Sequence, residues 1–128
     1  MRLGQHFLID RSIVDSIVSH ADLGSEDWVL EIGPGEGILT RELAARAGRV
    51  YAVEIDPDLA AGLCNMAPNV MVIHADALTV RLPQYNKIVS NLPYNISSKI
   101  TYRLLSRPFD LAVLMFQKEF AQRLKAEP

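Results

Sequence analysis

The arrangement of apolar residues constrains the fold of this chain more than any other feature of its sequence. Five short, mostly continuous apolar runs alternate with segments in which apolar residues recur at helical spacing. Continuous runs are typical of parallel strands that are buried on both faces, and their alternation with helices indicates βαβ units. The sequence therefore predicts an α/β fold, a doubly wound parallel sheet covered by helices. The predicted strands are 28–32, 50–54, 70–74, 87–90 and 111–116.

Capping residues place the helices between these strands. Asp56 followed by Pro57 is a typical helix start, because aspartate caps an N-terminus and proline fits the first helical position. Gly48 is the kind of residue that ends a helix. Helices are expected to start after Asp10, at about Ile38 (ending at Gly48), at Asp56, at about Ser98 and near Gln117.

Length and composition exclude several classes of protein. The 128 residues fit one domain, and a content of 49% hydrophobic and 22% charged residues is globular rather than disordered. The longest apolar run is far shorter than the roughly 18 to 20 residues of a membrane span, and the N-terminal residues lack a secretory pattern. The single cysteine, Cys64, suits a reducing compartment. We therefore expect a cytoplasmic protein that does not cross a membrane.

Charge is unevenly distributed along the chain. The formal net charge of -2 argues against a generally basic surface for nucleic acid. Residues 1–86 nevertheless carry -6 and residues 87–128 carry +4. The second segment offers either a surface for an anionic partner or an ordinary solvated helix face. Its basic residues are Lys87, Lys99, Arg103, Arg107, Lys118, Arg123 and Lys125.

The residues that follow the predicted strands are polar or rich in glycine, and ligands of open parallel sheets bind beyond the carboxyl ends of the strands. Gly33, Gly35 and Gly37 follow the first strand, where glycine lets the backbone turn sharply and approach a ligand. Glu54 ends the second strand, about 20 residues later, where a carboxylate can accept hydrogen bonds from ribose hydroxyls. Asp76, after the third strand, can accept one from an adenine amine. A surface acid and a turn cap are the alternative roles of these two carboxylates.

The glycine spacing helps to choose between two adenosine-containing ligands. The dinucleotide fingerprint G-x-G-x-x-G would need its third glycine at position 38, which is Ile38. The loop reads G-x-G-x-G instead, and Glu31 lies two residues before the first glycine. This pattern resembles the nucleotide loop of class I methyltransferases, which use S-adenosylmethionine.

The segment Asn91-Leu92-Pro93-Tyr94 follows the fourth predicted strand and suits a planar amine. An aromatic amino group such as N6 of adenine is a poor nucleophile, because its lone pair is delocalised into the ring. The Asn91 side-chain oxygen and the carbonyl of Pro93, or of Leu92, can each accept one of its N–H groups. Tyr94 can stack on the adenine. Orientation of the amine toward the methyl donor would then promote the reaction without a strong general base. An ordinary turn with a packing tyrosine is the alternative.

These motifs together resemble the ribosomal RNA adenine dimethyltransferase family over the whole chain. The matching segments are 3–8, 31–37, 54–56, 76–78, 91–98 and 117–121. The resemblance implies a Rossmann-like class I methyltransferase domain over residues 1–128 that transfers methyl groups from S-adenosylmethionine to N6 of adenosines, leaving S-adenosylhomocysteine. The implied partner is small-subunit ribosomal RNA in its precursor particle, with two adjacent adenosines near the 3′ end as targets.

The resemblance also implies roles for particular residues. The catalytic residues would be Asn91, Pro93 and Tyr94. The cofactor site would comprise His6 and Leu8 as lining residues, Gly33 and Gly35 beside the methionine moiety, Glu54 on the ribose, Asp76 and Ala77 on the adenine, and Asn91 on both cofactor and target amine. No metal is expected.

The chain departs from the family pattern at its ends. Family members continue into two more strands and a small helical RNA-binding domain, and they begin with a basic leader that is reduced here to Arg2. The sequence therefore resembles a fragment truncated after the fifth strand and its following helix. We expect such a fragment to bind S-adenosylmethionine weakly or not at all and to have little activity on ribosomal RNA. The complete protein is expected to be a monomer.

Other functions stay open at this point. The fold could serve as a non-catalytic RNA-binding module in small-subunit assembly, although the intact segment 91–94 argues for catalysis. The amine site could instead act on DNA adenine or on a protein glutamine, but related enzymes use Asn/Asp-Pro-Pro-Tyr/Phe, so Leu92 favours the ribosomal family. A nicotinamide-dependent oxidoreductase is a more distant alternative.

Overall fold

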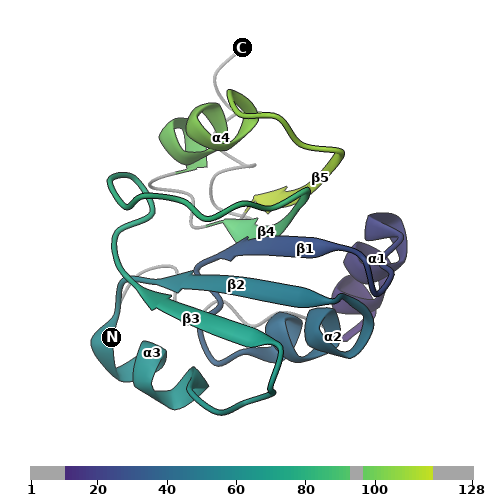
Figure 1. The fold of residues 1–128 in the computed structure, drawn as a ribbon, viewed down its shortest axis with the longest axis horizontal. Helices are drawn as coiled ribbons and strands as arrows, with labels where there is room; N and C mark the ends of the chain where they lie inside the picture. The colour runs from purple at the N-terminus through teal and green to yellow at the C-terminus, as the bar shows by residue number, and fades with distance from the viewer. Residues whose placement is uncertain (1–10, 93–96, 117–128) are drawn as a thin grey trace.

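The computed structural model describes residues 11–92 and 97–116, which form a five-stranded parallel sheet with flanking helices. All five predicted strands are present. They are β1 (Trp28–Ile32), β2 (Arg49–Glu54), β3 (Val70–His74), β4 (Lys87–Leu92) and β5 (Leu111–Phe116). Their order is β3-β2-β1-β4-β5, so the winding changes direction between β1 and β4 (Figure 1). The predicted doubly wound sheet is confirmed.

Four of the predicted helices lie within the described residues. They are α1 (Arg11–Ala21), α2 (Ile38–Arg46), α3 (Pro57–Leu63) and α4 (Ser97–Leu105). Asp56 caps α3 as predicted, since its Oδ1 accepts hydrogen bonds from the backbone N–H groups of Asp58 (2.8 Å) and Leu59 (3.2 Å). The expected cap Asp10 and the expected helix near Gln117 lie outside the described residues.

β2 begins at Arg49, one residue before the predicted start. Two other boundaries differ from the prediction for reasons that lie in neighbouring segments. β4 continues to Leu92 instead of ending at Ser90, because its last two residues pair with β5. α2 ends at Arg46, before Gly48. A Cβ atom on Gly48 would lie 2.1 Å from the backbone oxygen of Ser25, so this glycine permits a close approach of two chain segments instead of ending the helix.

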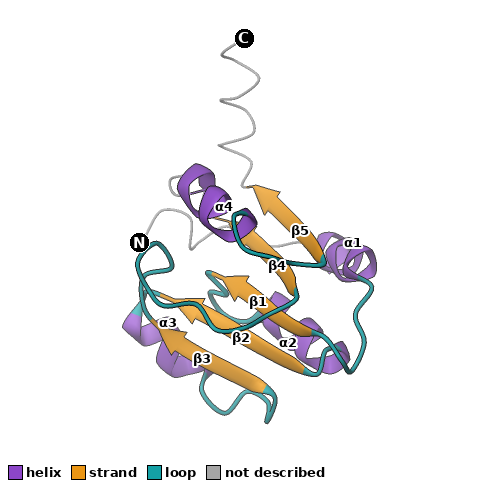
Figure 2. Ribbon diagram, turned by 45° about the horizontal axis from the view of Figure 1, so that its top comes forward, coloured by secondary structure: helices purple, strands orange, loops and turns teal. Residues whose placement is uncertain are grey.

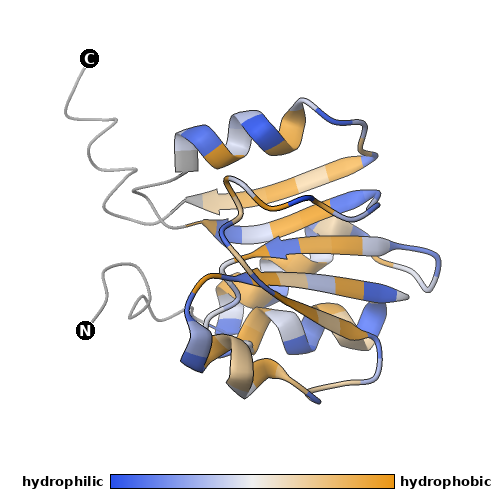
Figure 3. Ribbon diagram, turned by 60° about the vertical axis from the view of Figure 1, so that its left-hand side comes forward, coloured by the Kyte–Doolittle hydropathy of each residue, from blue (hydrophilic) through white to orange (hydrophobic). Residues whose placement is uncertain are grey.

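Apolar side chains form a core on each face of the sheet. α1 and α2 cover one face, and α4 together with the segment 75–86 covers the other (Figure 2). The strands are mainly hydrophobic, whereas α4 alternates between hydrophilic and hydrophobic residues (Figure 3). Within the described ranges, no helix is long and apolar enough to span a membrane. The first core includes Val14, Ile17, Val29, Leu43 and Val50, and the second includes Leu30, Ile88, Leu92, Ile100 and Leu104.

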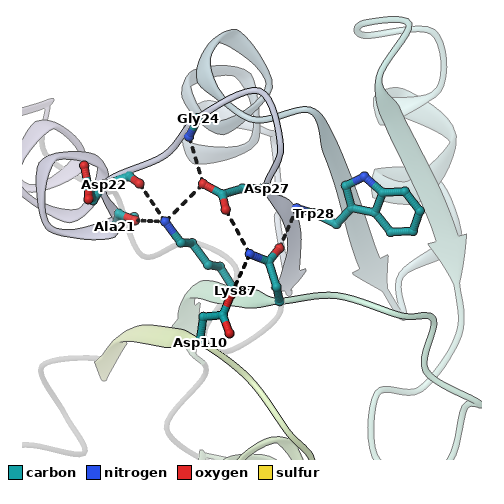
Figure 4. Close-up of polar contacts among 8 residues, drawn as sticks. Ala21, Asp22, Gly24, Asp27, Trp28, Lys87 and Asp110 are labelled. Atoms are coloured by element: carbon teal, nitrogen blue, oxygen red, sulfur yellow. Dashed lines mark hydrogen bonds and ion pairs between the residues drawn. The ribbon is translucent and has the colours of Figure 1, made fainter.

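Four polar side chains tie together the starting ends of β1, β4 and β5 (Figure 4). Lys87 Nζ donates to two carbonyl oxygens at the end of α1 (2.9 and 2.6 Å) and forms an ion pair with Asp27 (3.0 Å). Asn86 Nδ2 donates to Asp27 (2.9 Å) and to Asp110 (3.2 Å), while its Oδ1 accepts from the first N–H group of β1 (2.7 Å). We call Asp27, Asn86, Lys87 and Asp110 the basal network. It fixes the strand register at the end opposite the predicted ligand site.

Candidate active site

The loop after β1 adopts the backbone conformation that its glycines allow. Gly33, Gly35 and Gly37 all have positive φ angles (68°, 59° and 89°), which residues with a side chain rarely adopt. The Gly33 N–H donates to the backbone oxygen of Val53 (2.9 Å), so the loop crosses from the end of β1 toward the end of β2. A Cβ atom on Gly37 would also lie 2.3 Å from Cε of Met66. The sharp turn predicted here is confirmed.

Glu54 holds this loop at the carboxyl ends of the strands. Its side chain is buried at the end of β2, where Oε1 accepts from the Gly35 N–H (3.1 Å) and Oε2 from the Asp56 N–H (3.0 Å). Hydrogen bonds to a carboxylate are stronger than those between neutral groups. Glu54 therefore fixes the glycine loop relative to the start of α3, and its predicted contact with a ribose stays a prediction.

Glu31 is a buried carboxyl group for which the sequence analysis predicted no individual role. It lies in β1 with 2% of its surface exposed, and Oε1 accepts from the Thr40 hydroxyl of α2 (2.5 Å). Burial raises the pKa of Glu31 to about 8; the Thr40 hydrogen bond opposes this rise and the nearby charge of Glu54 adds to it. Glu31 is therefore mainly protonated at neutral pH. Its sequence signals are its place two residues before the first glycine of the loop and an acidic side chain within an apolar run.

This shift makes the free energy of unfolding depend on pH. Between about pH 4.5 and 8, Glu31 binds a proton in the folded chain but not in the unfolded one, so stability falls as pH rises. The slope from this group is at most about 1.4 kcal/mol per pH unit, and it vanishes above pH 8.

Glu31→Gln keeps an acceptor for Thr40 but cannot ionise. Urea unfolding from pH 5 to 8 should therefore show a smaller downward slope for Glu31→Gln than for the wild type. An unchanged slope, equal to that of the exposed Glu26→Gln control, would show that Glu31 is ionised when buried.

Ser90 marks the point where β1 and β4 diverge. The described ladder between these strands joins Val29 to Lys87 and Leu30 to Ile88 only. Farther along, the Ser90 hydroxyl donates to the backbone oxygen of Ile32 (2.6 Å) and accepts from its N–H (3.1 Å). A side chain thus replaces the ladder hydrogen bonds at the place where the strand order reverses. Ligands of doubly wound sheets bind at such a switch point.

Asn91 lies next to this switch point with an unsatisfied acceptor. Its Oδ1 is buried and accepts no hydrogen bond within the part of the chain that the structure describes. A buried carbonyl without a partner costs about 1–3 kcal/mol, which a donor group on a ligand can offset. The expected catalytic partners Pro93 and Tyr94 lie outside the described residues.

The predicted adenine contacts follow β3 in a compact turn. Asp76 Oδ1 accepts from the Leu78 N–H (2.9 Å), and its backbone oxygen accepts from the N–H groups of Thr79 (3.1 Å) and Val80 (2.9 Å). Ala77 is buried against the core beneath α4. Asp76 thus has the turn-capping role that was its alternative, and its contact with a cofactor stays a prediction. The other expected lining residues, His6 and Leu8, lie outside the described residues.

The basic segment is only partly available to an anionic partner. Lys87 is largely buried in the basal network, and Arg103 turns inward to donate to the backbone oxygens of Ala77 and Val80. Lys99 is exposed on α4. The positive surface of this region is therefore smaller than the number of its basic residues in the sequence suggests. Lys118, Arg123 and Lys125 lie outside the described residues.

Comparisons with known proteins agree with these features. A family model described as ribosomal RNA adenine dimethylase matches residues 1–128. The chain is 56% identical over 128 residues to a probable ribosomal RNA small subunit methyltransferase A of Methanothermobacter thermautotrophicus, and the match covers 98% of this chain and 47% of that protein. The protein of the same description from Thermococcus kodakarensis is 52% identical, with 98% and 46% covered. The chain spans about half the length of the curated relatives it matches.

Solved structures give the same result for the fold. A dimethyladenosine transferase from Plasmodium falciparum superposes with a TM-score of 0.82 and 37% identity, covering 95% of this chain and 47% of that one. The 23S rRNA methyltransferase ErmE superposes with a TM-score of 0.79 and 41% identity, covering 95% and 52%. The chain belongs to the ribosomal RNA adenine dimethylase family.

Proposed function

We propose that this chain is the cofactor-binding and catalytic part of an enzyme that transfers methyl groups from S-adenosylmethionine to N6 of adenosines in small-subunit ribosomal RNA. The observation that carries the proposal is the buried, unpartnered Oδ1 of Asn91 beside the divergence of β1 and β4. An acceptor in this position suits an N–H group of a substrate amine. Family membership and the names of the two relatives support ribosomal RNA as the substrate class.

The residues around the switch point fit S-adenosylmethionine. Gly33 and Gly35, which have positive φ angles and no side chains, would let the methionine moiety approach the backbone without obstruction. Glu54 at the end of β2 would hold the ribose, and Asp76 with Ala77 would hold the adenine. When bound, the cofactor supplies an electrophilic methyl group.

Asn91 would orient the target amine. Its Oδ1 would accept one N–H of N6, and the carbonyl of Pro93, or of Leu92, would accept the other, which would direct the nitrogen lone pair toward the methyl donor. Tyr94 would stack on the base once it has left its own stack. Orientation and fixed dipoles lower the barrier in such a site without a strong general base.

We further propose that RNA binding depends on chain beyond residues 1–128, because the relatives are about twice as long as this match. A fusion of residues 1–128 to the C-terminal half of the Methanothermobacter relative would supply that chain. The fusion should methylate small-subunit particles much faster than residues 1–128 alone. Equal rates would show that residues 1–128 already bind the RNA without the C-terminal half.

Calorimetric titration with S-adenosylhomocysteine tests the cofactor site. We expect saturable binding, with NAD giving none, in the fusion protein and more weakly in residues 1–128. Glu54→Ala should weaken it by about tenfold or more, because a carboxylate hydrogen bond to a ligand is worth about 1.5–3 kcal/mol. Glu54→Gln, which keeps the shape but loses the charge, should also weaken binding.

Glu26→Ala is the matched control, because it removes an exposed carboxylate near the starting end of β1. It should bind S-adenosylhomocysteine as the wild type does. Unchanged affinity in both Glu54 variants, with circular dichroism showing that they fold, would place the ribose elsewhere. Binding of NAD would favour the oxidoreductase alternative.

A further inference from the structure

The segment 75–86 is held against the sheet by α4. Arg103 donates from Nη1 to the backbone oxygen of Ala77 and from Nη2 to that of Val80. Its side chain is half-buried, so these two carbonyls accept from a charged donor that is partly shielded from water. We call residues 76–80 the adenine turn, after the contact proposed for Asp76 and Ala77.

A second set of contacts holds the remainder of the segment independently of the adenine turn. Arg107 donates from Nη2 to the backbone oxygen of Pro83 (3.4 Å), and its guanidinium group lies 5.1 Å from the centre of the Tyr85 ring. The Tyr85 hydroxyl donates to the backbone oxygen of Leu104 (3.5 Å). Arg103 in α4 and Arg107, two residues after the end of α4, therefore hold two different parts of the same segment.

α4 also connects the adenine turn to the proposed catalytic segment. β4 ends at Leu92 and α4 begins at Ser97, so the helix follows the stretch that starts with Asn91. Leu92, Ile100 and Ala77 belong to one buried cluster. A close-packed cluster of this kind transmits displacement instead of absorbing it. The position of α4 thus fixes both the end of β4 and the adenine turn.

We infer that Arg103 is a positioning residue for the cofactor's adenine, because its two-pronged contact sets the distance between the adenine turn and the helix that follows the catalytic segment. The inference rests on the proposed function. A guanidinium group presents its donors in a fixed planar arrangement, whereas a lysine ammonium is a point donor on a flexible stem. Lysine would therefore replace the contact only in part.

The test compares Arg103→Met, Arg103→Lys and the matched control Arg107→Met by titration with S-adenosylhomocysteine, in residues 1–128 and in the fusion protein. Methionine keeps an apolar stem and removes the donors. We expect Arg103→Met to weaken binding by about tenfold, Arg103→Lys to recover part of the loss, and Arg107→Met to stay within about twofold of the wild type. If the loss of affinity in all three variants is proportional to the drop in their unfolding temperature, Arg103 only stabilises the fold. That result would overturn the inference.

A double-mutant cycle with Asp76→Ala separates this inference from the proposed function. If Arg103 acts through the adenine turn, Arg103→Met should cost little further affinity once Asp76 is gone. Additive losses would overturn the inference. An Asp76→Ala variant that binds normally would instead refute the proposed adenine site, whereas a loss in Asp76→Ala with none in Arg103→Met would overturn the positioning role alone.

Amide hydrogen exchange tests the same idea in the free chain, even where affinity is too low to titrate. The N–H groups of Leu78, Thr79 and Val80 all bond to Asp76 and report on the adenine turn. Their exchange should quicken in Arg103→Met, slow again in Arg103→Lys and stay unchanged in Arg107→Met. Equal exchange in Arg103→Met and the wild type would contradict the inference.

Discussion

Replacing Asn91 with alanine should lower the rate of methyl transfer by roughly 100-fold or more, the loss typical of removing one preorganised polar group from an active site. The wild-type Oδ1 is already buried and unpartnered within the described residues, so it needs no rearrangement to accept an amine N–H group. Alanine removes one of the two acceptors that would direct the nitrogen lone pair toward the methyl donor. The rate is best measured under single-turnover conditions with labelled S-adenosylmethionine and the fusion protein, so that slow product release does not hide the effect.

Asn91→Asp is the matched variant for this experiment, because it keeps an acceptor oxygen at the same position. It should retain more activity than Asn91→Ala, and both variants should still bind small-subunit particles. An unchanged rate in Asn91→Ala would defeat the catalytic role and favour a non-catalytic RNA-binding module. Duplex DNA and a release-factor-like protein, tested as substrates beside RNA, separate the other amine methyltransferases.

Replacing Lys87 with methionine should lower the free energy of unfolding by about 3 kcal/mol, the cost typical of removing one partner from a buried ion pair. The side chains of Lys87 and Asp27 are only 12% and 14% exposed. Burial raises the pKa of Asp27, but hydrogen bonds from Asn86, from the Gly24 N–H and from Lys87 outweigh it and hold that pKa below its usual value. The substitution leaves a charged Asp27 and two carbonyls of the α1 end without their cation. Urea unfolding at pH 7 measures the loss.

Lys99→Met is the control, since Lys99 is exposed on α4 and its loss should change stability by no more than about 0.5 kcal/mol. The double variant Asp27→Asn with Lys87→Met should recover part of the loss, because it removes the charge left behind. Equal stability of the Lys87→Met and Lys99→Met proteins would show that the basal network contributes nothing to the fold.

The sequence predicted the architecture because buried parallel strands have a local signature. The runs 28–32, 70–74 and 111–116 became strands with these bounds, and Asp56 caps α3 as expected. The glycines at 33, 35 and 37 predicted the turn after β1, because the positive φ angles of this turn are readily adopted only by glycine. Each of these predictions depends on residues that are close together in the chain.

The features that the sequence did not predict depend on which segments become neighbours in space. The hydrogen bonds between the Ser90 hydroxyl and the Ile32 backbone require that β4 lie beside β1 and diverge from it. The raised pKa of Glu31 requires that α2 and the surrounding core cover that carboxyl group. Arg103 resembled a surface cation in the sequence, and only the fold shows that it binds the carbonyls of the adenine turn.

Product analysis of methylated RNA tests the central proposal most directly. Small-subunit particles that lack the modification would be incubated with labelled S-adenosylmethionine and the fusion protein, and the nucleosides would then be separated by mass. Label in N6-methylated adenosine, absent from the Asn91→Ala reaction, is the result that the switch-point site predicts. Label on another nucleoside or on protein, or none from a fusion protein that binds S-adenosylhomocysteine, would contradict the proposed reaction.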